Sequence, residues 1–563
     1  MKFDLREQSF STYGSYLAFS YPFDQNSPFS QKVCLRILHG EFERQDMYPL
    51  LLEDESGSEL PYEATGTPAE CTLNAGERQL RFCYQDADNV HFTGNCGVQI
   101  TKAELGGYNR AVYRREDLWE LAGDTSSLMV IVRAGRVVNE SVWSPRGTGD
   151  DAIRLRIVPD ETGRVDFQVQ RFDLTYRPKP YLPYEDNRAA KEQAFSQFLG
   201  QMPKLPEVYR EAAELALYIN WSSVVEPEGY VKAPAMLMTK SYMNFIWSWD
   251  YAFNALAMCQ GWEQLAYDQF LAMVHVQDED GAYPDCFNAR KLIRGFVKPP
   301  VQGFILDRML EFAVPPQEVL ETLYGSVSRL TRWWLDFRTG EDGLPLYHHG
   351  NDSGWDNGTA FAAGVPIQSP DLCTWLILQM DFLKRMALQL GKPDEADEWN
   401  AKADSLLAAM LDVLVEGDRF TALKVPENIR TGSNSLLLFV PLLLGERLPE
   451  ELRRSMLEDL LSPGRFQTAF GFASEAVDSV YFVEDGYWRG AVWPPLAYIL
   501  SEILRINGRE QEARENARTF CDNCVRAGFA ENYSALDGHP LRDNGYTWTT
   551  SVFLIFARDY LAD

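Results

Sequence analysis

A proline-rich stretch at residues 177–184, Arg-Pro-Lys-Pro-Tyr-Leu-Pro-Tyr, separates two parts of the chain that have different hydrophobic patterns. Proline lacks the backbone N–H that the interior of a helix or a sheet needs, so neither element is expected to continue through this stretch. The chain has 563 residues, which is longer than one ordinary domain. We therefore expect two domains joined by a linker over residues 179–200.

The N-terminal part, residues 1–178, is built of short runs that alternate in polarity or carry β-branched and aromatic residues. Gly, Asn, Asp and Pro separate these runs, as is typical of turns between strands. The clearest runs are 16–19, 33–38, 79–84, 128–132, 153–158 and 165–172. This pattern predicts an antiparallel β-sandwich.

The C-terminal part, residues 201–563, has a helical hydrophobic period. Proline near the first turn and glycine after the last turn mark several helix ends. Twelve candidate helices begin near Glu207, Tyr251, Glu263, Gly303, Gln317, Asp371, Asp394, Asn434, Glu450, Pro495, Arg509 and Thr547. Six helical hairpins closed in a ring, an (α/α)6 barrel, would use all twelve.

Five segments that mix polar and aromatic residues lie in the connections of this helical part. They are residues 247–250, 298–302, 352–357, 488–495 and 531–533. Each of them precedes an even-numbered helix of the predicted set. In a ring of hairpins the even-numbered helices occupy equivalent positions, so we expect the five segments to meet at one end of the barrel.

The middle segment has the chemistry of a sugar site. Asp356 lies between an aromatic side chain, Trp355, and an amide, Asn357. A flat aromatic ring covers the apolar face of a sugar, while carboxylates and amides bind its hydroxyl groups. A carboxyl group in this setting also suits protonation of a glycosidic oxygen.

The five segments together resemble the inverting glycosidases of glycoside hydrolase family 63 and its clan relative, the family 37 trehalases. The matching sequences are Trp-Asp at 249–250, Pro-Pro-Val-Gln at 299–302, Ser-Gly-Trp-Asp-Asn at 353–357, Trp-Arg-Gly-Ala-Val-Trp at 488–493 and Glu-Asn-Tyr at 531–533. They follow the order of the family and span the helical part. The N-terminal β-domain is also similar in texture to that of bacterial family 63 members.

The resemblance implies a role for each matching residue. Asp356 corresponds to the general acid, Glu531 to the general base, and Asp250 to an acid that holds sugar hydroxyls in the pocket. An inverting pair of carboxyl groups stands ~6.5–9.5 Å apart, with a water molecule between the base and the sugar. A buried position and a like charge such as Asp352 would raise the pKa of the acid.

The remaining candidate substrate-binding residues come from the same segments. Trp355, Trp493 and Tyr533 are expected to wall the pocket, and Arg489 and Gln302 to donate or accept hydrogen bonds. The whole additional set is Trp247, Trp249, Gln302, Asp352, Trp355, Asn357, Trp488, Arg489, Trp493 and Tyr533. At Asp352 the chain departs from the family pattern, which usually has Glu before Ser-Gly.

Structural alternatives exist for several of these residues. Asp250 also suits the N-cap of the helix that follows it, and Trp247 and Trp249 also suit a hydrophobic core. We interpret the possible metal ligands as structural: the adjacent pair 348–349 (His-His), the acidic turn 278–281 and the Cys-x-x-Cys at 521–524. No metal and no cofactor are expected.

Three functions fit these observations. The first is an inverting, exo-acting α-glycosidase, foremost an α-glucosidase for a disaccharide or short oligosaccharide. The second is a hydrolase of glucosylglycerate or mannosylglycerate, or an α-L-rhamnosidase, on the same barrel; a glycerate-bearing substrate would require cations, and Lys298, Arg290 and Arg294 are candidates. The third is a non-catalytic sugar-binding protein, against which the presence of both Asp356 and Glu531 argues.

Charge, apolar runs and cysteine content indicate which partners and which compartment to expect. The formal net charge of −28 disfavours binding to a phosphate backbone, so no nucleic-acid partner is expected. The N-terminus lacks the apolar region of a signal peptide, and no apolar run reaches the ~18 residues of a membrane span. The nine cysteines are odd in number and scattered, which favours reduced thiols in a cytoplasmic protein. The sequence leaves the oligomeric state open.

Overall fold

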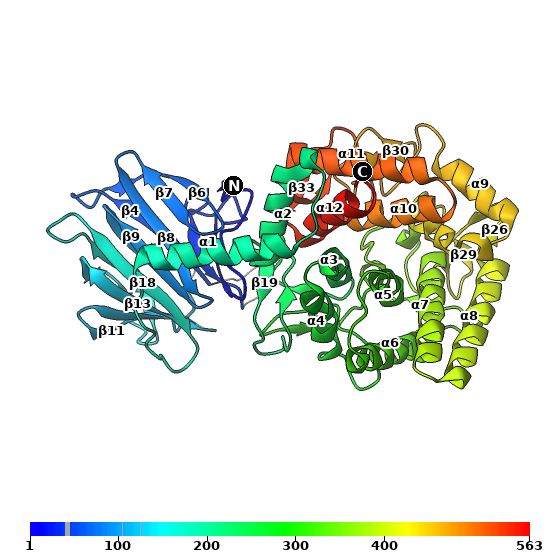
Figure 1. Cartoon of the computed structure of the whole chain (residues 1–563), viewed down its shortest axis with the longest axis horizontal. Helices are drawn as coiled ribbons and strands as arrows, with labels where there is room; N and C mark the ends of the chain where they lie inside the picture. The colour runs from blue at the N-terminus through cyan, green and yellow to red at the C-terminus, as the bar shows by residue number, and fades with distance from the viewer. Residues whose placement is uncertain (40–45, 104, 124, 563) are drawn as a thin grey trace.

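The computed structural model describes residues 1–39, 46–103, 105–123 and 125–562. A β-rich domain forms the N-terminal part, and a helical domain forms the rest of the chain (Figure 1). The two-domain division predicted from the hydrophobic pattern is therefore present, with strands up to Phe172 and helices from Tyr184 onward.

Two antiparallel sheets build the N-terminal β-sandwich. The order in the larger sheet is β1 (Phe3–Asp4), β6 (Glu63–Gly66), β7 (Cys71–Ala75), β8 (Arg78–Asp86), β9 (Asn89–Gly94), β18 (Val165–Phe172), β13 (Ser127–Ala134), β12 (Leu118–Ala122) and β11 (Arg110–Arg115). The order in the smaller sheet is β14 (Arg136–Asn139), β17 (Arg154–Val158), β10 (Gly97–Thr101), β4 (Asp46–Glu53), β3 (Cys34–Ile37) and β2 (Leu17–Ser20), and β5 (Glu59–Leu60) pairs with β4. A separate pair is β15 (Val142–Trp143) and β16 (Asp150–Ala152).

Aromatic side chains fill the space between the sheets. Phe92 on β9 and Phe167 on β18 stack with ring centroids 4.6 Å apart, and Phe19 on β2 packs against Phe82 on β8 at 4.3 Å. Large aromatic groups bury roughly 150–250 Å² each, so such pairs contribute strongly to a sandwich core.

Residues 179–200, which we expected to be a linker, are mostly helical. Helix α1 (Tyr184–Gln201) begins directly after Pro183 and lies along β8 and β9 of the larger sheet (Figure 1). Acidic residues in its first turn suit the positive end of the helix dipole. Its Asn187 amide bonds the His91 ring at 3.1 Å, and the Tyr184 hydroxyl donates to Glu70 at 2.6 Å. The helix is fixed to the β-domain because these side chains give it a buried face.

Twelve helical segments form the C-terminal domain. They are α2 (Arg210–Ser223), α3 (Asp250–Met258), α4 (Glu263–Val274), α5 (Gln302–Leu310), α6 (Gln317–Phe337), α7 (Pro370–Gln389), α8 (Pro393–Val413), η4 (Leu436–Arg447), α9 (Glu450–Leu460), α10 (Pro494–Ile506), α11 (Glu510–Ala527) and α12 (Thr547–Asp559). The predicted set is recovered, although η4 is a 3₁₀ segment, because Pro441 and the non-helical Gly445 interrupt it. A short turn, η1 (Glu207–Tyr209), precedes α2.

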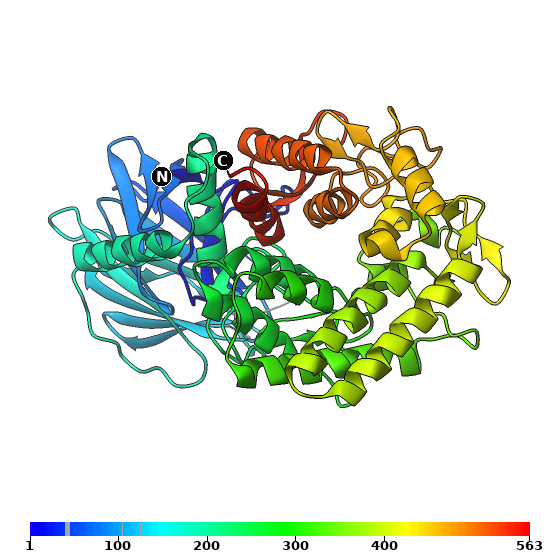
Figure 2. The ribbon, with the colours of Figure 1, turned by 45° about the vertical axis from the view of Figure 1, so that its right-hand side comes forward.

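Alternate helices line the inside of this domain. Helix α3 contacts α5, and the contacts continue through α7, η4, α10 and α12 back to α3. The other six helices cover this inner ring from outside (Figure 2). The inner helices α3, α5, α7, α10 and α12 are those that the five polar and aromatic segments precede, so the ring brings these segments together.

The described residues include every cysteine and all of the helices named above. All nine cysteines are free and buried, including Cys521 and Cys524 on α11. No helix among the described residues has both the length and the apolar character to span a membrane.

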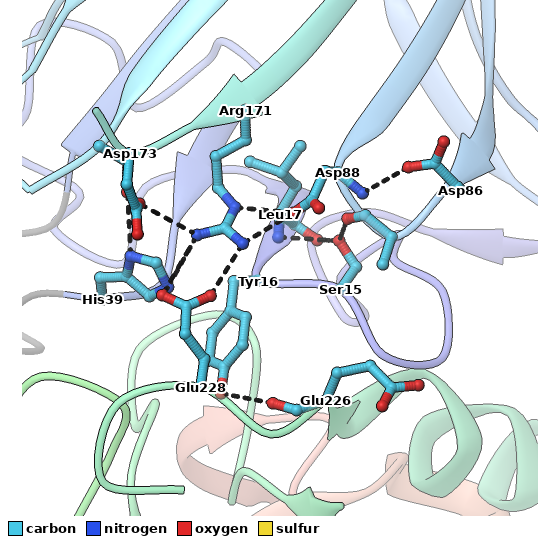
Figure 3. Close-up of polar contacts among 12 residues, drawn as sticks. Ser15, Tyr16, Leu17, His39, Asp86, Asp88, Arg171, Asp173, Glu226 and Glu228 are labelled. Carbon is cyan, nitrogen blue, oxygen red and sulfur yellow. Dashed lines mark hydrogen bonds and ion pairs between the residues drawn. The ribbon is translucent and has the colours of Figure 1, made fainter. Parts of the chain in front are cut away.

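A buried polar cluster joins the two domains (Figure 3). The Arg171 guanidinium of β18 binds Asp88 at 2.7 Å and Glu228 of the helical domain at 2.9 Å. His39 also bonds Glu228, at 3.1 Å between Nε2 and Oε1. Burial raises the pKa of Glu228, but the His39 bond and the Arg171 charge outweigh burial and lower it to about 2. Glu228 therefore stays ionised and bridges the domains.

Replacing Arg171, the arginine of this cluster, tests whether the cluster stabilises the contact between the two domains. We expect Arg171→Met to lower the free energy of unfolding by about 2 kcal/mol, because it removes the guanidinium that binds both Asp88 and Glu228. The remaining partners, His39 and Arg290 at Glu228 and Lys179 at Asp88, limit the loss. Urea unfolding followed by circular dichroism measures this change. A matched control is Arg210→Met, which removes an exposed ion pair with Glu207 and should change stability by less than about 1 kcal/mol. Equal effects of the two variants would contradict a stabilising role for the cluster.

Candidate active site

Three acidic residues, each from a different inner-helix connection, converge at one end of the helical ring. Asp250 is the first residue of α3, Asp356 lies between the turns η2 (Gly350–Ser353) and η3 (Thr359–Phe361), and Glu531 lies on β32 (Ala530–Tyr533). The charge of Asp356 raises the pKa of Asp250, and the charges of both raise the pKa of Glu531, which places the three within electrostatic reach. The sequence predicted this set, and the fold brings it together.

Two glycines shape the loop that carries Asp356. Gly354 has a φ of 75°, and a Cβ there would lie 2.7 Å from the Trp249 ring. A Cβ on Gly350 would lie only 2.0 Å from the Asp356 carbonyl oxygen. Gly354 is needed for its conformation and its space, and Gly350 for its space alone. The Gly-containing motif therefore brings the Asp356 backbone close to its neighbours.

Burial raises the pKa of all three acids. The pKa of Asp250 is about 7 and that of Glu531 about 8, and in both cases burial is the main cause. The Asp356 side chain keeps 34% of its surface exposed, yet the dense protein around it still raises its pKa. Asp250 and Glu531 are therefore suited to exchange protons near neutral pH.

A buried lysine neutralises part of this charge. The Lys298 Nζ lies 3.1 Å from the Asp285 carboxylate and 3.9 Å from that of Asp356, and it donates to the Asn351 side chain at 2.6 Å. It opposes the rise in pKa at Asp250 and Asp356, whereas Asp285 adds to that rise. We had expected Asp352 to be the like charge beside the acid; Asp285 is that charge instead.

Asp352 is bonded into an internal network of protein groups. Its Oδ2 accepts from Arg338 at 3.1 Å and from the backbone N–H of His348 at 3.0 Å, and its Oδ1 accepts from Val297 N–H at 3.2 Å. The residue is 1% exposed. Because both carboxylate oxygens are bonded to protein groups, Asp352 holds the loop rather than a ligand.

The tryptophans form a buried stack behind the acids. The Trp488 and Trp493 rings are parallel at 4.0 Å, and Trp355 packs on Trp488 at 4.9 Å. Trp249 approaches the same ring at 6.2 Å. These side chains are 3% exposed or less, so they support the site from within. The expectation that Trp355 and Trp493 wall the pocket is corrected: they stack on other rings instead.

Tyr533 is also directed into the core. Its hydroxyl donates to the Gly528 carbonyl at 2.6 Å, and the residue has no exposed surface. Gln302 is 1% exposed and donates to the Ser248 carbonyl at 2.9 Å, so it fixes the segment before Asp250. Trp247 is only partly buried and remains available for contact with a ligand.

Asp250 is not the N-cap of α3. Trp249 occupies that position, without a side-chain capping bond, and Asp250 is the first helical residue. One carboxylate oxygen, Oδ2, is buried and has no hydrogen-bond partner among the described residues. An unsatisfied buried acceptor is unfavourable without a ligand or water, so the geometry favours a binding role over a capping role.

Asn357 and Arg489 connect the loop of the acid to the segment before α10. The Asn357 side chain donates to the Gly486 carbonyl and accepts from Trp488 N–H, both at 3.0 Å. The Arg489 Nε donates to the Asn357 carbonyl at 2.8 Å. Among the described residues, no carboxylate lies within ion-pair distance of Arg489, although it is only partly buried. Burial raises the pKa of Glu475, and the charge of Arg489 opposes that rise.

Four functional neighbours were not among the predicted site residues. Asp285 and Tyr487 flank Asp356, and Arg542 and Asp543 of β33 (Pro540–Asn544) flank Glu531. Tyr487 adjoins a predicted aromatic segment and Asp285 follows Tyr-Pro, which were usable signals. Arg542 and Asp543 had none, because only the pairing of β33 with β32 brings them to the base.

Of the cations proposed for a glycerate group, only Lys298 lies among the acids. Arg290 binds Asp173 at 2.8 Å and Glu228 at 2.9 Å in the domain junction. Arg294 lies on an exposed loop. Lys298 is already surrounded by carboxylates, so it neutralises the site rather than offering a free charge.

The candidate metal ligands have structural contacts. The Asp278 carboxylate accepts from the N–H groups of Gly281 and Ala282, which makes an ordinary turn. His349 Nδ1 accepts from Asn351 N–H at 3.0 Å. Two donor groups elsewhere in the described chain have metal-compatible spacing, and they are His39, Asp173, Glu228 and Glu484, Asp537, His539. The first is already paired with arginines, and the absence of a cofactor stays a prediction.

Comparison with known proteins gives a consistent result. Residues 242–549 match the model of the mannosylglycerate hydrolase MGH1-like glycoside hydrolase domain. A glucosylglycerate hydrolase of Mycolicibacterium hassiacum is 23% identical over 55% of this chain and 91% of its own length. The mannosylglycerate hydrolase MGH2 of Selaginella moellendorffii is 22% identical over 56% of this chain and 80% of its own.

Solved structures share the fold at low identity. A family 63 mannosylglycerate hydrolase from Thermus thermophilus, in complex with Tris and D-glycerate, aligns with a TM-score of 0.54 and 19% identity, over 61% of this chain and 99% of its own. A bacterial glucoamylase complexed with acarbose aligns with a TM-score of 0.66 and 11% identity, over 98% of this chain and 93% of its own. The second alignment extends over both domains.

The segment that matches the family model covers more than half of the chain and includes Asp250, Asp356 and Glu531. This result confirms the resemblance to glycoside hydrolase family 63 that the five segments predicted. The protein belongs to the family of mannosylglycerate hydrolase MGH1-like glycoside hydrolases and is an enzyme that acts on glycosidic bonds.

Proposed function

We propose that this enzyme is an inverting, exo-acting hydrolase of a hexose linked to glycerate, such as glucosylglycerate or mannosylglycerate, and that its helical domain is an (α/α)6 barrel. The similar proteins act, by their names, on glucosylglycerate or mannosylglycerate, which favours this substrate class over the α-glucoside that was our first interpretation. The observation that carries the proposal is the convergence of Asp356 and Glu531, with Arg489 bonded to the backbone of the loop that carries the acid.

In the proposed mechanism Asp356 is the general acid. It is the more exposed of the two carboxyl groups, at 34% of the side chain against 6% for the Glu531 residue, so it borders the side from which a leaving group departs. Its proton passes to the glycosidic oxygen as the bond from that oxygen to the anomeric carbon breaks, and the bonding electrons remain on the oxygen. Glycerate leaves with its hydroxyl group neutral.

Glu531 is the general base in the same mechanism. It removes a proton from a water molecule whose oxygen bonds to the anomeric carbon from the opposite face. The reaction ends with Asp356 ionised, Glu531 protonated and the anomeric configuration inverted; proton exchange with solvent restores both groups. Asp250, with its unsatisfied oxygen, accepts a hydrogen bond from a sugar hydroxyl.

Arg489 is the proposed partner of the glycerate carboxylate. Its guanidinium is bonded to the carbonyl of Asn357, the residue that follows the acid. Arginine is well suited to bind a carboxylate through two parallel N–H groups. Lys298 is unsuited to this role because Asp285 and Asp356 already surround it.

The acid and base assignments predict separate effects. Asp356→Asn and Glu531→Gln should each lower kcat on a glycerate conjugate by ~10²–10⁴-fold, because each removes one proton transfer. A substrate with an activated leaving group should restore part of the activity of Asp356→Asn and none of that of Glu531→Gln. Proton NMR spectra recorded before mutarotation identify the anomer of the sugar that is released first. With the wild type we expect the inverted anomer.

Controls for these variants come from the outer helices. Asp397→Asn on α8 and Glu510→Gln on α11 make the same chemical changes at exposed positions and should leave kcat unchanged. Wild-type turnover in either active-site variant, or a retained anomer, would refute the mechanism.

The pH dependence of kcat/KM should follow the base. Glu531 must be ionised to act, and its pKa of about 8 predicts a loss of activity as the pH falls below that value. Asp543 raises this pKa and Arg542 lowers it. Asp543→Asn should therefore move the acidic limb of the profile to lower pH, and Arg542→Met should move it to higher pH, each by roughly one unit. Shifts in the same direction for both variants would exclude Glu531 as the group that titrates.

Substrate discrimination should depend on Arg489. Arg489→Met should raise KM for the glycerate conjugate about 10- to 100-fold, because a charge-assisted bond to the carboxylate is lost. The corresponding glycerol conjugate has no carboxylate and serves as the matched substrate, with an expected change below about threefold. Equal losses on both substrates would show that Arg489 only positions the loop and would leave the carboxylate without this partner.

A further inference from the structure

A cavity of about 360 Å³ lies between the β-domain and the helical domain. Residues 5–9, 20–23, 25 and 30–31 of the β-domain form one side, and Ser241 with residues 542–544 forms the other. This volume is at the lower end of the range of small-molecule sites. Residues 5–31 lie outside the segment that matches the family model, which begins at residue 242.

The cavity shares a wall with the active site. Arg542 and Asp543 line it, and the same two residues set the electrostatic surroundings of Glu531. Their strand, β33, pairs with the strand of Glu531. Arg542 has a φ of 65°, a left-handed conformation that is unfavourable for arginine, and it lies over the Tyr487 ring at 4.9 Å. The strand is thus held in a strained form where the two spaces adjoin.

Two buried polar atoms on the β-domain side have no partner. The Gln8 side-chain oxygen and the Tyr21 hydroxyl are buried without a hydrogen bond among the described residues, and both residues line the cavity. Each residue is 7% exposed. A Cβ on Gly545 would lie 2.2 Å from the Gln8 oxygen, so close packing fixes the amide in place. Neither atom has accessible surface toward the cavity, so the polar groups that a ligand can reach there are those of the more exposed lining residues Gln25, Ser30 and Gln31.

The charges that line the cavity are balanced. Arg6 and Arg542 carry the two positive charges, and Glu7 and Asp543 the two negative charges. Arg542 is already paired with Asp485 at 2.7 Å. The balance disfavours an anion, including glycerate, and favours a neutral ligand with many hydroxyl groups.

An aromatic side chain completes a sugar-like site at the cavity. Phe23 lines it, is 44% exposed, and stacks on Tyr242 with ring centroids 4.3 Å apart and an angle of 16°. Stacking on one face leaves an exposed flat surface that is already held in orientation. Such a surface, next to amides and hydroxyls, is the combination that binds the apolar and polar faces of a pyranose ring.

We propose that this cavity is a second carbohydrate site, which takes one neutral hexose unit at the domain junction. Phe23 covers one face of the ring, and Gln25, Ser30 and Gln31 bind its hydroxyl groups. The site is separate from the catalytic acids, and its existence does not depend on the substrate class proposed above.

Equilibrium dialysis of the intact protein with radiolabelled D-glucose and D-mannose tests this inference. For at least one of these hexoses we expect two bound molecules per chain in the wild type, one at the catalytic acids and one at the junction. Phe23→Ala should weaken the second site by about 3- to 10-fold, the loss expected for one aromatic contact. Tyr113→Ala removes an aromatic side chain of the same domain that is 60% exposed, and it should leave both sites intact.

A second variant and a crystal soak test the same site independently. Gln31→Met retains the length of the side chain but removes the amide, and it should weaken the same site while turnover is preserved. A soaked crystal should place the hexose against Phe23. One bound hexose per chain for both sugars, two sites that persist in both variants, or binding of D-glycerate in place of the hexose at the junction would each overturn the proposal.

Discussion

The active site depends on one buried cation. Lys298 lies among Asp285, Asp356 and Asp250. Without a cation, burying three negatively charged carboxylates so close together would be strongly unfavourable. The cation lets these carboxylates share a small space, and burial raises the pKa of Asp250 to about 7 and also raises that of Asp356. Removing one partner from such a buried network is strongly unfavourable, so the loops that carry these residues are held together by electrostatics as well as by packing.

The β-domain takes part in this organisation. Lys240 of the helical domain is buried and donates to the Thr12 carbonyl of the β-domain, as well as to the Val224 carbonyl. Its neighbours Thr239 and Ser241 both donate to Asp543, at 2.7 and 2.6 Å. The segment that the β-domain holds therefore also orients an acid beside the base Glu531. This contact gives a physical reason for the β-domain to be docked at this end of the ring.

The corrected aromatic assignments have a common cause. The sequence shows that a tryptophan adjoins an acid, but not which way each side chain points. Because Trp488 and Trp493 stack in parallel and Trp355 packs on them, the rings satisfy one another and leave little surface for a ligand. The contacts that remain for a substrate come from polar groups and from Trp247, which is only partly buried. The rigid stack instead fixes the loops on which the acids lie.

Hydrophobic period, proline positions and five short motifs determined the two-domain division, the order of the helices and the three converging acids. These features can be predicted because they depend on neighbouring residues or on the order of motifs along the chain. Tertiary structure alone decided that Asp285 rather than Asp352 adjoins the acid, that Arg542 and Asp543 flank the base, and that residues 184–201 form a helix on the β-domain. Each of these depends on side-chain direction or on contacts between segments that are distant in sequence. The pattern of residues along the chain does not specify either of them.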